Sequence, residues 1–426
     1  MTPSKTKKRC KMTTIQTLLK PDRIVLLAIT IVLIVAVTII SYTNGWMDVN
    51  HYWDNINEWY DDGLIPYKDY VFEYPPLSLL IFLIPRLFSW DLDSYHFMYA
   101  IFSMIAYIGI SKLTLDLTKD DERLRPYIVL LFLLIPIFGI RFILTRNDIF
   151  AVAAIIISIW CYKNNHKRLA FILIGLGAMI KLYPILLIVP YLANEISRRD
   201  VKSFLECIII IAATCVIIEL PFMINDFDSA FSYLSYHEDR PIQIESVVAT
   251  FMYFAYLLGY TDLHYIESYG SDNMWGELPD KVAPYMNDVL SWSLIIVIAF
   301  LLIIAIWSKK WDDNMKIRMF ILTSLAMILT FIIFNKVYSA QYMLWVLGLT
   351  PLMLWSISSE KARRVGFVIT IIFGSVSGIA AATYSSYDIN DWFISIEATK
   401  NFLTIAMLCF VIYAIYTESK IYRLRA

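Results

Sequence analysis

The chain has 426 residues, of which 59% are hydrophobic and only 17% are charged, and its net charge is −1. Soluble globular domains carry about 25% charged residues, so the composition excludes an ordinary soluble protein, and the balanced charge gives no indication of a nucleic-acid partner. The apolar residues form long runs rather than the alternating strands of a barrel. We therefore expect a membrane protein built from helices, because helices satisfy their own backbone hydrogen bonds in lipid.

The first apolar run, residues 24–42, separates a basic segment from an acidic one. Residues 1–23 contain seven Lys or Arg residues and one acid, whereas residues 43–75 contain seven acids and one Lys. Because Lys and Arg favour the cytoplasmic side of membrane helices, we predict a cytoplasmic N-terminus. Residues 43–94 then form a first extracytoplasmic loop with an interfacial part. The run itself is expected to be a retained anchor, since it is too long for a signal-peptide core.

The remaining apolar segments follow in chain order, and the loops between them alternate between basic and acidic. Residues 76–88 are too short to cross the membrane and are expected to be re-entrant or interfacial. Residues 225–287 form a second large extracytoplasmic loop. The predicted fold is all-α: one polytopic transmembrane bundle over residues 1–426, with both termini cytoplasmic, in the cell membrane if the chain is prokaryotic. About twelve crossings are predicted, at residues 24–42, 95–117, 127–145, 148–162, 168–181, 184–194, 203–224, 288–307, 317–334, 342–357, 364–383 and 398–417.

Two of these crossings are shorter than the membrane. Residues 148–162 and 168–181 extend only about 21–22 Å at the helical rise, against a hydrocarbon core of roughly 30 Å. Short or interrupted helices are tolerated in a bundle where they line a cavity that is buried in protein or filled with water. This pair of helices is therefore the first indication of a functional site.

The polar residues next to the apolar segments gather on the extracytoplasmic side. An ionisable group inside the hydrocarbon costs about 2.5–3.5 kcal/mol on insertion scales, so such groups are candidates for function. Independent snorkelling would scatter them over both faces of the membrane. The candidate site residues are Asp48, Tyr67, Asp69, Glu73, Tyr74, Arg146, Asp148, Lys181, Tyr183, His237, Arg240, Lys336 and Gln341.

Four of these candidates are bases on the side that the charge bias disfavours: Arg146, Lys181, Arg240 and Lys336. Each needs a partner there, and an anionic lipid head group supplies one. Arg binds phosphate oxygens with two parallel hydrogen bonds, and Lys acts as a compact point charge. Simpler explanations exist for single residues, because Lys181 can snorkel to the interface and Arg146 can form an ordinary ion pair with Asp148.

Adjacent acids raise the question of a metal site. The pair Asp61-Asp62 has no His beside it, and the pair Glu238-Asp239 adjoins Arg240, whose charge repels a cation. Metal sites in proteins bring several ligands to one point, and consecutive side chains rarely converge in this way. We expect no metal and no other cofactor.

Several short motifs together carry a family resemblance. They are Asp48-Val49-Asn50-His51-Tyr52, Pro66-Tyr67-Lys68-Asp69, Glu73-Tyr74-Pro75-Pro76-Leu77, Arg146-Asn147-Asp148, Gly175-Leu176-Gly177, Lys181-Leu182-Tyr183-Pro184 and Ser339-Ala340-Gln341-Tyr342. In this order they resemble the GT-C superfamily of glycosyltransferases. The most similar pattern is that of the polyprenol-phosphate-mannose-dependent α-(1→2)-mannosyltransferases, glycosyltransferase family 87. The likeness covers roughly residues 24–350.

The resemblance implies a GT-C type bundle whose donor is a polyprenyl or dolichyl phosphate sugar in the membrane lipid. Mannose is favoured, and the acceptor is a glycolipid or another lipid-linked or surface glycan. Asp48 occupies the position of the general base, and a single displacement with one base predicts inversion at the anomeric carbon. If the first helix continues past Tyr42, Asp48 lies about 9 Å further out.

The resemblance also assigns roles to other residues. Arg240, Lys336 and Lys181 would hold the charge that develops on the donor phosphate, and His237 and Glu73 would orient sugar. The glycolipid-anchor mannosyltransferases share a comparable arrangement of Asp, Pro-Tyr and Tyr-x-Pro, so the identity of the sugar is left open.

Two other functions fit parts of the pattern. Broken helices and about twelve crossings also suit a transporter or flippase of a lipid-linked sugar, although the sequence shows no internal repeat. A lipid-linked-oligosaccharide ligase or polymerase is also polytopic with a large outer loop. Product formation separates an enzyme from the transporter, and product length separates single-sugar transfer from the ligase.

Overall fold

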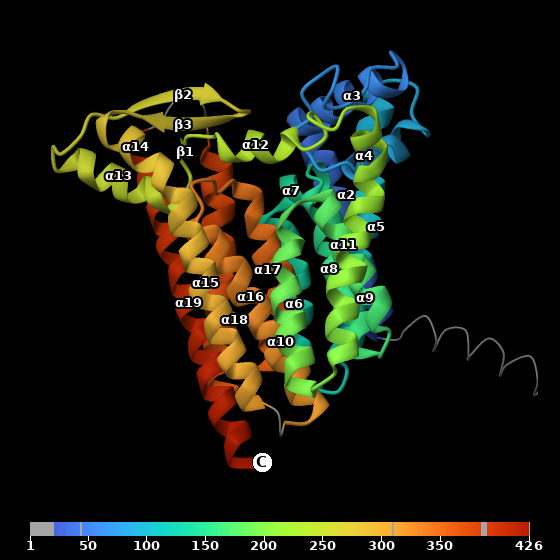
Figure 1. The fold of residues 1–426 in the computed structure, drawn as a ribbon, viewed down its shortest axis with the longest axis vertical. Helices are drawn as coiled ribbons and strands as arrows, with labels where there is room; N and C mark the ends of the chain where they lie inside the picture. The colour runs from blue at the N-terminus through green and yellow to red at the C-terminus, as the bar shows by residue number, and fades with distance from the viewer. Residues whose placement is uncertain (1–20, 43–44, 309–310, 385–389, 426) are drawn as a thin grey trace, which may run out of the picture.

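The computed structural model describes residues 21–42, 45–308, 311–384 and 390–425, and it forms a helical bundle (Figure 1). The helices of the bundle are α2 (Pro21–Tyr42), α5 (Leu92–Leu117), α6 (Arg125–Phe138), α7 (Ile140–Thr145), α8 (Asp148–Lys163), α9 (Lys167–Ile180), η1 (Tyr183–Leu187), α10 (Ile188–Arg198), α11 (Val201–Asn225), α15 (Met286–Trp307), α16 (Asp313–Phe334), η4 (Ala340–Tyr342), α17 (Met343–Ser356), α18 (Glu360–Thr383) and α19 (Asp391–Arg425). The architecture is that of an all-α polytopic protein, as the hydropathy predicts.

Seven helices among the described residues are long and apolar enough to cross a membrane. They are found at Arg23–Ser41, Leu92–Leu117, Val201–Asn225, Glu277–Trp307, Asp313–Phe334, Glu360–Thr383 and Asp391–Ile421. The other predicted crossings correspond to shorter helices. The segment 127–145 is divided into α6 and α7 at Gly139, three residues after Pro136, which cannot continue the ladder of hydrogen bonds inside a helix.

Burial distinguishes the centre of the bundle from its periphery. In α16, 83% of the residues of its most apolar stretch are buried inside the protein. The corresponding share is 17% in α11 and in the span that contains α15. The exposed side chains of α11 and α15 are large and apolar, as Ile217 and Ile296 illustrate. Exposed apolar faces of this size are stable against lipid rather than water.

Glycine allows close helix contacts, as two examples illustrate. A Cβ atom at Gly175 in α9 would lie 2.7 Å from the Cβ of Thr214 in α11, and one at Gly378 in α18 would lie 2.6 Å from the carbonyl oxygen of Phe138. Small residues allow membrane helices to approach closely and gain van der Waals contact. Gly175 belongs to the Gly-Leu-Gly motif of the sequence, and its role here is packing.

Both predicted extracytoplasmic segments lie at one end of the bundle, opposite the C-terminal end of α19 (Figure 1). They contain the helices α3 (Met47–Tyr60), α4 (Ser78–Arg86), α12 (Ser232–Glu238), α13 (Val247–Leu257), α14 (Glu277–Val282) and η2 (Ala283–Tyr285). The segment predicted to be re-entrant or interfacial forms α4, a helix of nine residues. Its approach is fixed by a hydrogen bond from the Leu77 N–H to the carbonyl of Met179 at the end of α9, 2.9 Å long.

A small antiparallel sheet covers part of this outer end. Its strands are β1 (Ile242–Gln243), β2 (His264–Ser268) and β3 (Ser271–Trp275), in the order β1-β3-β2, with Ile242 opposite Met274. The turn between β2 and β3 has positive φ at both Tyr269 and Gly270, the geometry of a two-residue hairpin turn. These strands are not among the elements predicted from the sequence.

Candidate functional site

Asp48 lies in the first turn of α3, at the outer end of the bundle. Helix α2 ends at Tyr42 and α3 begins at Met47, so the first helix does not continue to Asp48 as one rod. The carboxylate therefore belongs to a separate helix, where the partial positive charge of the helix N-terminus favours a negative side chain. Its position is set by the packing of α3 and not by extension of α2.

The carboxylate of Asp48 forms an ion pair with Arg146. Nη1 of Arg146 contacts Oδ1 of Asp48, and the two side chains are 24% and 21% exposed. Arg146 lies in extended backbone between the end of α7 and the start of α8. Its Nε is buried and has no hydrogen-bond partner among the described residues. The cation therefore orients the candidate base and retains a donor for a further ligand.

A second ion pair lies close to the first. Nζ of Lys181 is 3.4 Å from Oδ2 of Asp148, which is fully buried in the first turn of α8. Oδ1 of Asp148 accepts a hydrogen bond of 2.6 Å from the indole N–H of Trp345. Lys181 follows α9 in extended backbone, so the end of this short helix places its side chain inside the protein.

These two ion pairs differ from the simpler explanations considered for Arg146 and Lys181. Arg146 pairs with Asp48 rather than with Asp148, and Lys181 is 17% exposed and paired rather than extended to the membrane surface. Helices α8 and α9 both begin or end at this cluster. The two short crossings thus deliver charged groups to one buried place, as their length indicated.

Aromatic rings form the floor of this cluster. The ring of Tyr183 stacks on Trp345 with centroids 3.9 Å apart, and Tyr342 stacks on Trp345 at 3.7 Å. All three are buried. The indole holds Asp148 while its faces hold the two tyrosines, so the motifs that contain Tyr183 and Tyr342 meet at one side chain that the sequence did not single out.

Glu73 and Tyr74 approach from the first outer segment. Oε1 of Glu73 is 3.9 Å from Nε2 of His51, and Nζ of Lys181 lies 5.3 Å from the ring centre of Tyr74. Burial opposes the charge of Glu73, but hydrogen bonding with Tyr74 and the positive field of His51 and Lys181 outweigh burial and hold its pKa below the ordinary value. Glu73 is therefore an ionised acceptor beside the two ion pairs.

Tyr67 and Asp69 organise the same segment and make their contacts within it or against α11 and α12. The hydroxyl of Tyr67 donates to the carbonyl of Tyr74 at 2.6 Å, and its ring packs against Tyr233 of α12. Tyr67 also has a positive φ of 70°, which few non-glycine residues adopt. Oδ2 of Asp69 accepts from the Ile65 N–H at 2.8 Å. Both residues shape the loop that presents Glu73 and Tyr74.

Arg240 and Lys336 form a second group of cations, in which both bases donate to neutral oxygens. Nη2 of Arg240 donates to the Ser271 hydroxyl at 2.5 Å, and Nζ of Lys336 donates to the carbonyl of Glu238 at 2.6 Å. Both side chains are buried, and within the described ranges neither has a carboxylate within ion-pair distance. Burial lowers the pKa of Lys336 in spite of acidic neighbours.

The two remaining predicted residues are Gln341 and His237. Gln341 is buried in η4. His237 belongs to α12, but its side chain lies outside the described part of the chain.

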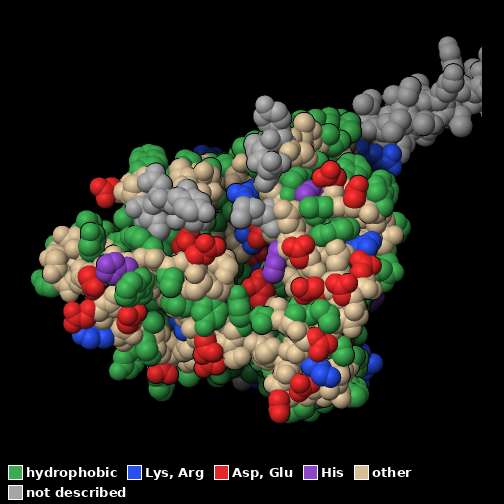
Figure 2. Space-filling model, turned by 90° about the horizontal axis from the view of Figure 1, so that it is seen from above, with side chains coloured by type: hydrophobic (Ala, Val, Ile, Leu, Met, Phe, Trp, Pro, Cys, Tyr) green, Lys and Arg blue, Asp and Glu red, His purple; other side chains and the backbone are tan. Residues whose placement is uncertain are grey.

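A chain of contacts connects the two groups. Tyr342 stacks on Trp345, which donates to Asp148, and Ser339, three residues before Tyr342, is hydrogen-bonded to Gln243 of the second outer segment. Viewed from above, acidic, basic and His side chains gather between the lobe that carries β2 and β3 and the lobe that carries α3 (Figure 2). The outer segments and the short helices therefore assemble a single charged site.

Sequence reasoning missed several members of the site. Glu245 is buried and accepts a hydrogen bond from the side-chain amide of Gln243. Glu397 and Lys400 form a buried ion pair of 2.5 Å at the outer part of α19. The sequence signal for Glu397 and Lys400 is that two ionisable residues stand at the start of an apolar segment. Trp345 gave no signal, because Trp is common in membrane helices.

No cluster of three or more His, Cys, Asp or Glu side chains that could hold a metal occurs among the described residues. The charges of the site are instead arranged as carboxylate–cation pairs and as cations with neutral partners. Such a set can bind an anion, orient a carboxylate and hold hydroxyl groups.

Comparison with family models places part of the chain in a known family. The model of glycosyltransferase family 87 matches residues 72–333, which is more than half of the chain. The matched range contains Glu73, Arg146, Lys181 and Arg240, but it begins after Asp48 and ends before Lys336. A search of the curated proteins found no match.

Proposed function

The chain belongs to glycosyltransferase family 87 and is a membrane glycosyltransferase, and from this premise we propose that it transfers one hexose from a polyprenyl or dolichyl phosphate to a glycolipid or lipid-linked glycan. The reaction takes place at the extracytoplasmic surface. The observation that carries the proposal is the ion pair between Asp48 and Arg146, together with two buried cations, Arg240 and Lys336, that donate to neutral oxygens. A general base and a phosphate site are the two parts that this transfer requires.

The reaction is a single displacement at the anomeric carbon. An acceptor hydroxyl attacks, its oxygen forms the new glycosidic bond, and its proton passes to Asp48. Arg146 engages Oδ1 of Asp48, and we assign the proton to Oδ2. The bond from the anomeric carbon to the phosphate oxygen breaks, and its electron pair leaves with the lipid phosphate. One displacement with one base predicts inversion.

The leaving phosphate gains negative charge as the bond breaks. Arg240 and Lys336 are suited to this charge because they are buried and bond only to neutral oxygens in the contacts of the described residues. Cations placed where charge develops, in a site that excludes water, stabilise the transition state more than they would in water. Arg146 and Lys181 already balance carboxylates, so we assign them to orienting Asp48 and Asp148.

Mannose is the favoured sugar through the family resemblance, and the acceptor is proposed only by class. The direct test reconstitutes the purified protein in phospholipid vesicles with radiolabelled polyprenyl phosphate mannose, the glucose counterpart and a glycolipid fraction as acceptor. We expect a labelled glycolipid enlarged by one hexose, with the anomeric configuration inverted relative to the donor, and undiminished by excess chelator.

Three results would contradict the proposal. Movement of labelled lipid across the vesicle membrane without a product would indicate a transporter. Transfer of an oligosaccharide block would indicate a ligase. Loss of activity with chelator that manganese or magnesium restores would show that a metal takes part.

A further inference from the structure

Glu245 is a buried acid that the proposed displacement does not use. Its side chain is 4% exposed, in the segment between β1 and α13. Oε2 accepts a hydrogen bond of 2.8 Å from the side-chain amide of Gln243, whereas Oε1 is buried without a partner among the described residues. An unpaired oxygen on a buried carboxyl is costly, and it needs an explanation.

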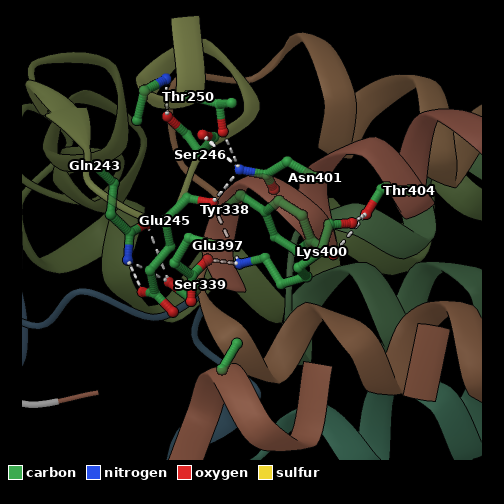
Figure 3. Close-up of polar contacts among 12 residues, drawn as sticks. Gln243, Glu245, Ser246, Thr250, Tyr338, Ser339, Glu397, Lys400, Asn401 and Thr404 are labelled. Atoms are coloured by element: carbon green, nitrogen blue, oxygen red, sulfur yellow. Dashed lines mark hydrogen bonds and ion pairs between the residues drawn. The ribbon is translucent and has the colours of Figure 1, made fainter. Parts of the chain in front are cut away.

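The backbone carbonyl of Glu245 is anchored to helix α19 (Figure 3). Nζ of Lys400 and Nδ2 of Asn401 each donate to the Glu245 carbonyl at 3.2 Å. The ammonium of Lys400 is paired with Glu397 at 2.5 Å. Helix α19 therefore fixes the position of this segment through groups that a change in the Glu245 side chain leaves in place.

Hydrogen-bonding groups and a buried ion pair surround the carboxyl: Glu397 and Lys400 act on it electrostatically, and the backbone N–H of Ala340 faces it. The amide of Gln243 bonds to Glu245 and also to the hydroxyl of Ser339, at 3.2 Å. Ser339 belongs to the Ser-x-Gln-Tyr motif that follows Lys336. Carboxylate, amide and hydroxyl together can accept from and donate to a hydroxyl group, which is itself both donor and acceptor.

This group of polar side chains borders the charged site. The backbone N–H of Gln243 donates to the carbonyl of Lys336 at 3.0 Å, so this group lies next to one of the two cations assigned to the phosphate. A sugar whose phosphate lies at Arg240 and whose anomeric carbon faces Asp48 would present its ring hydroxyls to such a neighbourhood. The unpaired Oε1 then has a natural partner in the substrate.

We propose that Glu245, with Gln243 and Ser339, forms a subsite that binds a ring hydroxyl of the transferred hexose. The inference rests on the proposed function and adds a specificity-determining residue to it. A site built to hydrogen-bond a substrate hydroxyl discriminates strongly against an analogue that lacks it, because the buried partner is left unpaired.

The test measures equilibrium binding of polyprenyl phosphate mannose and its 2-, 3-, 4- and 6-deoxy analogues to the reconstituted protein. The native protein should bind one of the four analogues about tenfold or more weakly than the parent lipid. Glu245→Gln should bind the parent lipid about as weakly, and it should no longer distinguish that analogue from it. Ser339→Ala should reduce the same discrimination, which gives a second variant with a smaller change.

A matched variant shows what a purely structural role would look like. Asn401→Ala removes part of the backbone anchor, and it should weaken the parent and all analogues by one common factor. If Glu245→Gln also weakens all five lipids equally, or changes none of them, the subsite is wrong while the proposed function stands. If the native protein neither binds nor uses any polyprenyl phosphate hexose, the proposed function itself fails and the subsite fails with it.

Discussion

Arg146 and Lys181 each contact a carboxylate, whereas Arg240 and Lys336 donate to neutral oxygens. The four bases look equivalent in the sequence, but in the structure two have their charge balanced by a carboxylate and two do not. A base already paired with a carboxylate mainly orients that carboxylate. A buried base with neutral partners keeps a full charge for an anion, and it is the better candidate for the donor phosphate.

Neutralising the second group should therefore weaken donor binding. For Arg240→Gln and Lys336→Gln we expect the dissociation constant of polyprenyl phosphate mannose to rise about tenfold or more, the usual scale for a hydrogen bond to a charged group. Lys281→Gln is the matched control, because Lys281 lies at the same end of the protein but is 68% exposed and paired with Glu277. Normal donor affinity in both buried variants would remove these residues from the phosphate site.

Glu245 gives a prediction about pH and stability. Burial, reinforced by Glu397 and opposed by Lys400 and Arg146, raises the pKa of its carboxyl from 4.5 to about 7. The folded protein then holds this proton more tightly than the unfolded chain. The resulting stabilisation is complete below about pH 4.5 and is lost as the pH rises through about 7.

The apparent melting temperature in detergent should fall between about pH 5 and about pH 7.5. The fall should be smaller in Glu245→Gln, which cannot ionise. Glu267→Gln is the control, since Glu267 is exposed on β2 of the same outer segment. Equal falls in the native protein and in Glu245→Gln would show that this carboxyl does not carry the effect.

At the scale of elements, α18 packs closely against the point where α6 ends and α7 begins. The contact is between Gly378 of α18 and the backbone of Phe138, the last residue of α6. A Cβ at position 378 would lie 2.6 Å from the Phe138 carbonyl oxygen and 3.3 Å from the carbonyl carbon. These are backbone atoms at the end of α6, so they cannot rotate away as a side chain would. The helices would have to separate, and overpacking of this kind typically costs about 1–3 kcal/mol.

Gly378→Ala should therefore lower the melting temperature in detergent. Gly109→Ala should leave it unchanged or raise it, because a Cβ at Gly109 in α5 meets no atom within 4 Å and alanine favours a helix over glycine. A similar response from both variants would mean that the α18 contact does not need glycine.

The elements that the sequence predicted well are those with a strong local signal. Long apolar runs predicted the helices of the bundle. The short length of residues 148–162 and 168–181 predicts a functional site, and charged groups meet at the start of α8 and the end of α9. The partners of those groups were predicted less well, since the pairing of Arg146 with Asp48 joins residues far apart in the chain. Trp345 and the sheet carried no comparable signal, because packing and not hydropathy determines them.

At the scale of the whole molecule, the acidic and basic loops lie at opposite ends of the bundle. The acidic outer segments lie at one end of the bundle, and the basic loops lie at the other, where Arg198 pairs with Asp313 at 2.5 Å and Arg363 with Asp121 at 2.7 Å. The charge bias predicts that this second end faces the cytoplasm. The candidate site then lies at the extracytoplasmic end of the bundle, where we expect acceptors to arrive.

Single cysteines test this orientation in a variant whose five native cysteines are replaced. Cysteines at Asp54 and Glu267, both exposed at the outer end, should react with an impermeant maleimide in intact cells. Cysteines at Asn314 and Lys361, both exposed at the other end, should react only after the membrane is opened. The reverse pattern would place the site on the cytoplasmic side and overturn its assignment to an extracytoplasmic reaction.

The assignment of Asp48 as general base is the central claim, and Asp48→Asn tests it most directly. The amide keeps the size of the side chain and an oxygen that can accept from Arg146, but it cannot take a proton. Transfer should fall by roughly 10²-fold or more, the usual scale for acid–base groups, while donor binding is retained. Asp54→Asn, an exposed acid on the same helix, should transfer normally. If Asp48→Asn transfers at a near-normal rate while Glu73→Gln abolishes transfer, Glu73 is the general base and the assignment of Asp48 is wrong.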